Sequence, residues 1–193
     1  MSDRGDWGGN DFNDVFSGAA NLIKLGYTTA SQVSHMGWSY GGYMSALAMG
    51  TVQDSYGFPL QKIVTGGTLS DLISHTGTTD ITKIIKSWAG GYHWDSPDLR
   101  AMMTAHSGIY HVEKATAATL MFHGAQDPRM PISQSFQLHY ALKARGIPVR
   151  FLTFPGSGHI PGDPNQIKTV WDETLAWLTP AAAKDETGSP VVV

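Results

Sequence analysis

The chain has 193 residues, of which 41% are hydrophobic and 15% charged, and its formal net charge is −3. This length fits one domain with its own core, and the composition is that of a globular rather than a disordered protein. The weak negative charge, without clusters of Lys and Arg, argues against nucleic acid as a partner, and no apolar run is long enough to span a membrane. The chain has no cysteine, which excludes disulfides and thiol catalysis.

Two further features of the sequence concern location and cofactors. The first residues, Met1-Ser2-Asp3-Arg4, do not form an apolar leader, so we expect a cytoplasmic protein. The histidines between residues 75 and 111 lack the spacing of zinc ligands. We therefore expect neither a metal nor another cofactor.

The first predicted elements are a helix, a strand and a second helix. Apolar residues recur at helical spacing between Phe12 and Ile23, Asn10 is suited to the N-cap, and Gly26 would end the helix. A strand is predicted over residues 33–37, followed by a helix of small and apolar residues that starts near Gly42.

Three more strands follow along the chain. Apolar or β-branched runs predict them over residues 62–66, 118–123 and 149–154, and periodic apolar residues predict helices near 81–88, 132–144 and 167–178. The stretch 69–114 is otherwise expected to be irregular, and the tail 181–193 to be flexible. This alternation predicts an α/β fold in a single domain over residues 1–180, with about four parallel strands joined by right-handed crossovers and flanked by helices.

The most informative motif lies between the first strand and its helix, where Gly37-Trp38-Ser39-Tyr40-Gly41 has the form G-x-S-x-G. A serine between a strand and a helix sits on a sharp turn that exposes its hydroxyl. We expect side chains at Gly37 and Gly41 to collide with neighbouring backbone in so tight a turn. The Tyr40 amide, at the N-terminus of the helix, would face an oxyanion formed at the serine.

Partners for this serine follow later in the sequence. A serine hydroxyl becomes a nucleophile when a base takes its proton and an acid orients that base. Asp127 lies just after the third predicted strand, and His159 follows the fourth. Both occupy loops at the carboxyl ends of strands, where open α/β sheets place their sites. Asp163 is a weaker candidate for the acid because it follows the histidine loop instead of a strand.

Several segments carry a family resemblance: residues 37–44, 123–131 and 156–159, and also residues 5–15, 87–91 and 94–97. Together they resemble the catalytic domain of the prolyl oligopeptidase family, above all its dipeptidyl-peptidase and acylaminoacyl-peptidase branches. The resemblance runs from about residue 5 to about residue 178. It implies an α/β-hydrolase fold with Ser39 as nucleophile, Asp127 as orienting acid and His159 as general base. It also suggests that Arg129 contacts substrate carbonyls.

The sequence also departs from the family pattern. Relatives carry further strands and a second oxyanion donor upstream of the segment matched here, and most carry a β-propeller. We therefore expect a truncated α/β-hydrolase fold, the C-terminal part of the family's domain, with the nucleophile strand at an open sheet edge. An unpaired edge invites another strand, so we expect a homodimer or a part of a larger chain. His35 stands where relatives usually have a small or aliphatic residue.

These features favour a serine hydrolase that cleaves a small ester or a peptide through an acyl-enzyme on Ser39. Trp88 and Tyr92 either line a substrate pocket or belong to the core, and Arg129 either contacts substrate or is a solvated loop cation. One alternative is a non-catalytic or nearly inactive domain, because loss of one oxyanion donor costs about 10²–10³ in rate. Another is a biosynthetic enzyme that reuses the fold for lactone or thioester chemistry.

Overall fold

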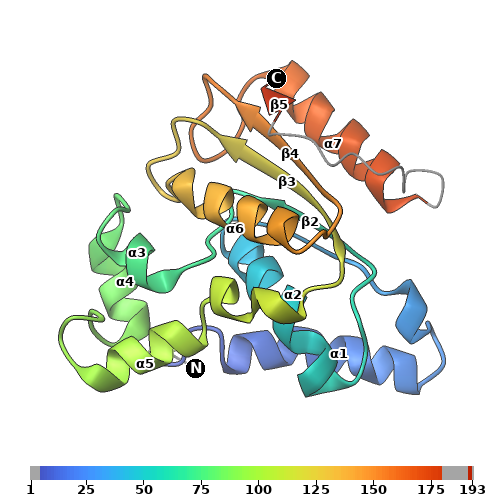
Figure 1. Ribbon diagram of the computed structural model, residues 1–193, viewed down its shortest axis with the longest axis horizontal. Helices are drawn as coiled ribbons and strands as arrows, with labels where there is room; N and C mark the ends of the chain where they lie inside the picture. Colours follow the sequence, from blue (N-terminus) through green and yellow to red (C-terminus); the bar gives the residue numbers. More distant parts are fainter. Residues whose placement is uncertain (1–4, 180–190, 193) are drawn as a thin grey trace.

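The computed structural model describes residues 5–179 and 191–192, and a parallel sheet forms its centre (Figure 1). The strand order β1-β2-β3-β4-β5 is also the order along the chain. The four strands expected from the sequence are present, and the first begins two residues later than expected. The strands are β1 (His35–Trp38), β2 (Lys62–Gly66), β3 (Ala118–Gly124), β4 (Val149–Phe154) and β5 (Val191–Val192).

The short strand β5 adds to the four predicted strands. It pairs in parallel with β4, opposite Leu152 and Thr153. It falls inside the segment 181–193, for which we expected a flexible tail. The remainder of that segment lies outside the described residues.

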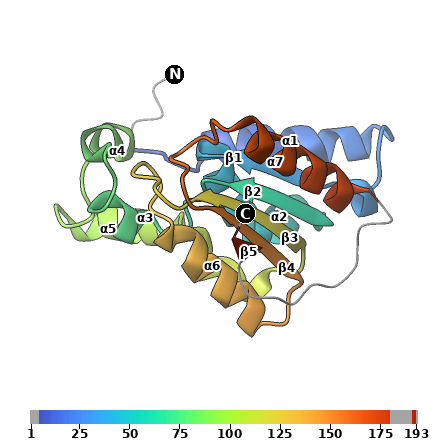
Figure 2. The same ribbon diagram turned by 90° about the horizontal axis from the view of Figure 1, so that it is seen from above.

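Helices cover both faces of the sheet (Figure 2). Helices α2 (Tyr40–Tyr56) and α6 (Ser133–Ala144) lie on one face, and α1 (Asn10–Lys24) packs beside α2. This side holds the larger apolar core, which includes Phe16, Leu47, Ile63 and Leu138. Helix α7 (Pro164–Leu178) covers the other face, where Trp177 packs with apolar side chains of β2, β3 and β4 in a smaller core. Hydrophobic burial on both faces therefore fixes the sheet between its helices.

The stretch 69–114 is more regular than we expected. Besides the predicted helix, α4 (Thr82–Ala89), it contains α3 (Leu72–Thr76), α5 (Pro97–Ala105) and the 3₁₀ helix η2 (Gly108–Lys114). The Asp71 carboxylate caps α3, and the Ser96 hydroxyl accepts the Leu99 amide at the start of α5. These helices are too short to show a clear periodic pattern, so their caps were the only local signals. Another 3₁₀ turn, η1 (Ala30–Gln32), precedes β1.

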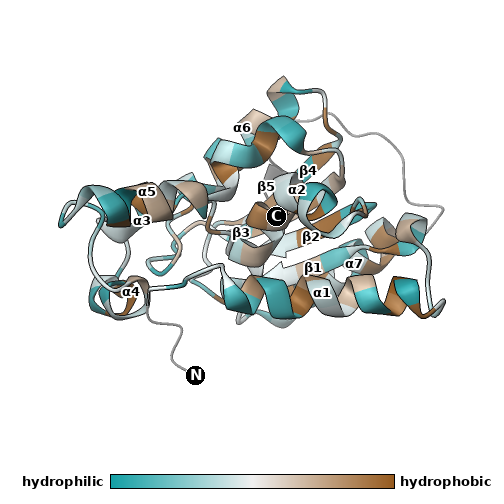
Figure 3. Cartoon of the chain, turned by 90° about the horizontal axis from the view of Figure 1, so that it is seen from below, coloured by the Kyte–Doolittle hydropathy of each residue, from teal (hydrophilic) through white to brown (hydrophobic). Residues whose placement is uncertain are grey.

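Strand β1 lies at the edge of the sheet in the described part of the chain, as the sequence predicted. Met36, in this strand, is 51% exposed. Apolar residues are also exposed on the two nearby helices, Val15 and Leu22 on α1 and Trp171 and Leu175 on α7 (Figure 3). The apolar stripe predicted for α7 is thus only partly covered, because the smaller core contacts just one side of the helix. None of the described helices is long and apolar enough to cross a membrane.

Candidate active site

Ser39 lies on a strained turn between β1 and α2. Its φ is 59° and its ψ is −117°, and it is the only residue other than glycine with a positive φ in the described part of the chain. Such a conformation is unfavourable for an L-residue and persists only where the surroundings hold it. The Ser39 amide donates to the Gly66 carbonyl (2.9 Å), which ties the turn to the end of β2.

The glycines around Ser39 have different roles. A Cβ at Gly37 would lie 2.2 Å from the Gly41 carbonyl oxygen, so no side chain fits there. Gly41 itself has open space at the Cβ position, so our prediction of a collision at Gly41 is wrong. The close approach comes one residue later, because α2 crosses the end of β2. A Cβ at Gly42 would lie 2.7 Å from the Gly66 carbonyl oxygen.

The structure brings Ser39, Asp127 and His159 together at the carboxyl ends of their strands. His159 Nε2 lies 2.7 Å from Ser39 Oγ, and His159 Nδ1 lies 2.8 Å from Asp127 Oδ2. Both distances are those of hydrogen bonds. A neutral imidazole with its proton on Nδ1 can therefore donate to the carboxylate and accept the serine proton at Nε2.

The environment of Asp127 keeps its carboxylate ionised. The side chain is buried, and Oδ1 accepts the amides of Arg129 (2.8 Å) and Met130 (2.9 Å). Burial raises the pKa of Asp127, but hydrogen bonds from His123, His159 and the Met130 amide outweigh burial and hold this pKa well below its usual value. An ionised carboxylate at this position favours the Nδ1–H tautomer of His159 and stabilises its protonated form.

Close packing fixes the loop that carries His159. A Cβ at Gly124 would lie 2.0 Å from the Gly158 carbonyl oxygen, so this loop touches the loop after β3 at a glycine. On the other side, the indole Nε1 of Trp38 donates to the His159 carbonyl (2.8 Å). Trp38, which directly precedes Ser39, thereby joins the nucleophile strand to the histidine loop.

Tyr40 places a backbone amide beside Ser39 and anchors it through its side chain. As the first residue of α2, it lies at the positive end of the helix dipole. The Tyr40 hydroxyl donates to the Asp11 carboxylate, and its ring stacks on Trp7 with 6.0 Å between centroids. Burial and the neighbouring Asp11 carboxylate raise the pKa of Tyr40, so the phenol stays neutral. The N-termini of α1 and α2 are thus joined next to the serine.

The two aromatic residues predicted to bind substrate lie in different surroundings. Trp88, at the end of α4, makes an edge contact with the ring of Tyr40 at 6.2 Å between centroids, and 43% of the residue is exposed. It therefore lies beside the residue that follows Ser39. Tyr92 instead stacks on Trp94 at 4.7 Å in a second aromatic cluster. The substrate roles of Trp88 and Tyr92 stay predictions.

Arg129 is tied to the segment between α3 and α4. Its Nε and Nη2 donate to the Asp80 carboxylate at 2.7 and 3.2 Å. Its carbonyl accepts from His75 Nε2 (2.9 Å) and Thr79 Oγ1 (2.8 Å). A substrate carbonyl would have to compete with Asp80 or use the remaining N–H groups. Contact between Arg129 and substrate stays a prediction.

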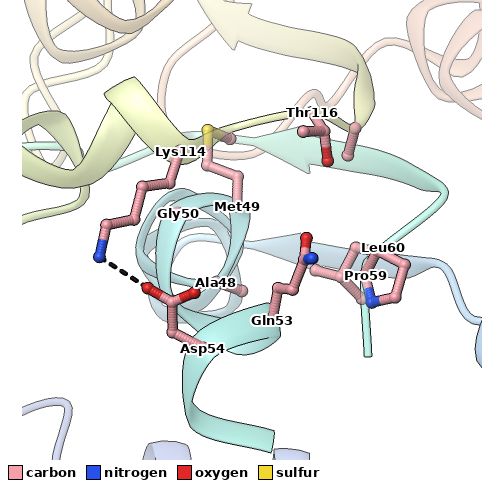
Figure 4. A pocket seen from close by; sticks show the side chains of 10 residues that line it. Ala48, Met49, Gly50, Gln53, Asp54, Pro59, Leu60, Lys114 and Thr116 are labelled. Atoms are coloured by element: carbon pink, nitrogen blue, oxygen red, sulfur yellow. Dashed lines mark hydrogen bonds and ion pairs between the residues drawn. The ribbon is translucent and has the colours of Figure 1, made fainter. Parts of the chain in front are cut away.

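A surface pocket elsewhere is separate from these residues. It contains the exposed Lys114–Asp54 ion pair (2.7 Å) and lies along the C-terminal half of α2 (Figure 4). Asp54 lies about 20 Å along the helix from Tyr40, because an α-helix rises 1.5 Å per residue. The described residues contain no group of three or more His, Cys, Asp or Glu that could hold a metal ion.

Two residues that hold the site, Asp11 and Trp38, were not predicted from the sequence. Asp163, which was considered as the acid, lies outside the site. Asp11 and Trp38 lie in segments that carried the family resemblance, but their partners depend on tertiary packing that the sequence does not display. The ring of His123 contacts the Ser135 hydroxyl (2.6 Å). Asp163, the weaker candidate for the acid, caps α7 instead, since its carboxylate accepts the Asn165 amide (2.7 Å).

A serine on a strained strand–helix turn, with a histidine and an acid on the loops of later strands, defines the α/β-hydrolase class of proteins. The model of the prolyl oligopeptidase family matches residues 2–185. The chain belongs to the prolyl oligopeptidase family, as the resemblance of its motifs predicted.

Relatives by sequence are longer than this chain. The acylamino-acid-releasing enzyme of Mus musculus is 28% identical over 178 residues, which are 90% of this chain and 24% of the relative. Dipeptidyl aminopeptidase BIII of Pseudoxanthomonas mexicana is 27% identical over 198 residues, which cover 98% of this chain and 28% of the relative. The chain thus spans about a quarter of the length of these relatives.

Solved structures share the fold. A Mycobacterium tuberculosis puromycin-hydrolyzing peptidase matches with a TM-score of 0.81 at 21% identity, over 98% of this chain and 28% of that chain. The Pyrococcus horikoshii acylaminoacyl peptidase matches with a TM-score of 0.80 at 22% identity, over 96% of this chain and 30% of that chain. Both matches support the α/β-hydrolase fold predicted from the sequence.

Proposed function

We propose that the chain is a serine hydrolase that cleaves ester or peptide bonds through an acyl-enzyme on Ser39. The observation that carries this proposal is the imidazole of His159, which is hydrogen-bonded to Ser39 Oγ (2.7 Å) and to Asp127 Oδ2 (2.8 Å) at the same time. Membership of a peptidase family supports the same class of reaction.

In the proposed reaction, His159 Nε2 takes the hydroxyl proton as Ser39 Oγ bonds to the substrate carbonyl carbon. The resulting oxyanion faces the Tyr40 amide at the N-terminus of α2. The protonated imidazole, stabilised by Asp127, gives its proton to the leaving alcohol or amine as the bond to the carbonyl carbon breaks. A water that loses its proton to His159 then attacks the acyl carbon, and the imidazole gives that proton to Ser39 Oγ as the bond to the serine breaks and the acid leaves. The reaction needs no cofactor.

The proposed substrate is a small ester or a peptide. The exposed indole of Trp88 beside Tyr40 offers an apolar surface close to Ser39, suited to a hydrophobic group of the substrate. The names of relatives support acylated amino acids and short peptides as the natural compounds to test, since they include an acylamino-acid-releasing enzyme and a dipeptidyl aminopeptidase.

The proposal is tested by a double-mutant cycle on a p-nitrophenyl ester. Ser39→Ala and His159→Ala should each remove nearly all turnover while the melting temperature shows an intact fold. Because residues that act as a unit are not additive, the double variant should be little worse than either single variant. Losses that multiply in the double variant would contradict the shared mechanism.

A nearly inactive hydrolase domain is the second candidate function. It is favoured by one observation: the Tyr40 amide is the single oxyanion donor that we identify among the described residues. The absence of a second donor costs about 10²–10³ in rate. The same cycle separates the candidates, since an inactive domain would hydrolyse the ester no faster than its Ser39→Ala variant. Nothing in the described residues favours the biosynthetic alternative.

We also propose that another polypeptide segment covers the edge of β1, either from a second copy in a homodimer or from a larger chain that includes this one. The unpaired side of β1 and the exposed apolar residues beside it support this. A monomeric mass by light scattering across a wide concentration range would exclude the dimer. The cytoplasmic location expected from the sequence also stays a proposal, which cell fractionation would test.

A further inference from the structure

A second histidine lies behind Asp127. His123, in β3, is fully buried, and the hydroxyl of Ser135 lies 2.6 Å from its Nδ1. Its Nε2 lies 2.7 Å from the Met130 carbonyl oxygen and 3.4 Å from Asp127 Oδ2. Both nitrogens of this ring therefore have partners, although the proposed reaction does not use the ring.

These contacts settle where the proton of His123 lies. Nε2 faces a carbonyl and a carboxylate, which are both acceptors, so Nε2 must carry the proton. In the neutral ring Nδ1 is then an acceptor, and the Ser135 hydroxyl donates to it. Ser135, at the start of α6, thus sets the tautomer, and the Nε2–H of His123 is directed at the turn 127–130.

We propose that His123 is a positioning residue for the catalytic acid, which holds the turn 127–130 so that the Asp127 carboxylate faces His159. This inference rests on the proposed function, because Asp127 is the acid only if His159 is the base. Met130 transmits the effect, since its carbonyl accepts from His123 and its amide donates to Asp127 Oδ1 (2.9 Å). A shift of the Met130 carbonyl would move both peptide groups that flank Met130, and with them the carboxylate.

A buried histidine away from this turn provides the control. His139, in α6, is fully buried, and neither of its ring nitrogens has a hydrogen-bond partner in the described structure. Its ring packs against Phe151 in β4. His139→Asn should therefore lower the melting temperature without turning the Asp127 carboxylate away from His159.

The test compares His123→Gln with His123→Asn. The glutamine amide can place a donor near the former Nε2, whereas the shorter asparagine can replace only Nδ1. For an aryl ester, kcat/KM should fall by about 10²-fold in H123N, as expected for a misplacement of about 1 Å in a catalytic group. In H123Q it should fall by no more than about fivefold, because one hydrogen bond is at most weakened. The loss in H123N should lie in kcat, with KM unchanged.

Rescue by glutamine separates positioning from simple destabilisation. A protein that is only destabilised has a lower melting temperature, whereas a misplaced carboxylate lowers kcat in the protein that stays folded. H123Q and the control His139→Asn should therefore keep kcat within about fivefold of the wild type, while H123N loses kcat well below its melting temperature. If H123N does not fold, Ser135→Ala should lower kcat by a smaller amount.

One readout does not depend on turnover. The proton between His159 Nδ1 and Asp127 should give a downfield NMR resonance that H123Q keeps and H123N loses. Equal activities and equal resonances in H123N and H123Q would overturn the positioning role. A wild type no more active than Ser39→Ala would overturn the proposed function alone, and the resonance would still decide the role of His123.

Discussion

The acid and base of the candidate site are held differently from its nucleophile. Asp127 and His159 follow β3 and β4, and each of these strands has a neighbour on both sides. Ser39 follows β1, which among the described residues pairs on one side only and exposes Met36. The acid and base are therefore fixed within the described chain. The position of the nucleophile depends on its own strained turn, on α2 and on whatever covers the edge of β1.

Two hydrogen bonds connect these regions. The Ser39 amide donates to the Gly66 carbonyl (2.9 Å), and the Trp38 indole donates to the His159 carbonyl (2.8 Å). Both start from residues at the end of β1; one reaches the end of β2, and the other reaches the loop after β4. The serine can thus keep its alignment with His159 although one edge of its strand is open. The nucleophile region and the acid–base region can therefore be tested by separate experiments.

The largest effect is expected from a change to the acid, Asp127→Asn. An amide at this position favours the wrong tautomer of His159 and removes the charge that stabilises its protonated form, so kcat should fall by about 10⁴-fold, as in other triads. Steady-state kinetics with an aryl ester would measure the loss of kcat, and circular dichroism would verify the fold. A loss of less than tenfold would mean that Asp127 is not the acid.

A smaller effect is expected in a comparison of substrates, which tests the nucleophile region. One identifiable oxyanion donor, the Tyr40 amide, should bias the protein toward reactive acyl groups, by about 10²–10³ per missing donor. The value of kcat/KM for an aryl ester should therefore far exceed that for an aryl amide with the same acyl group. Amide turnover close to ester turnover would show that a complete oxyanion hole exists, with a donor outside the described residues.

The smallest effect concerns stability and the nucleophile strand. Burial lowers the pKa of His35 to about 4, while its Nδ1 lies 3.0 Å from the Ser45 hydroxyl. An unfolded histidine titrates near 6.5. Between about pH 6.5 and pH 4 the unfolded chain therefore binds the extra proton, and the stability contributed by neutral His35 is lost as the pH falls.

The variant His35→Leu should remove this dependence. Its free energy of unfolding in urea should fall less than that of the wild type between pH 7 and pH 4. Burial also lowers the pKa of His75 and His139, and these residues titrate in both proteins, so the difference between the two curves isolates His35. Parallel curves would contradict a neutral, half-buried His35.

The sequence was sufficient to predict the main architecture and to name Ser39, Asp127 and His159, which the structure brings together. Strong local patterns marked the strands, and the serine motif lay between a strand and a helix, as its chemistry requires. The contacts of Trp38 and Asp11 were not predictable, because their partners His159 and Tyr40 lie far along the chain. The short helices α3 and α5 were also missed, since one or two turns leave little periodicity. Gly42, not Gly41, proved to be the glycine that packing requires.

Labelling with a fluorophosphonate probe shows most directly whether His159 activates Ser39. Mass spectrometry of the digested protein would locate the adduct. We expect a single adduct on Ser39 in the wild type and a large loss of labelling in His159→Ala, with an unchanged melting temperature. An unlabelled wild type, or labelling of Ser39 at the same rate without His159, would contradict this activation.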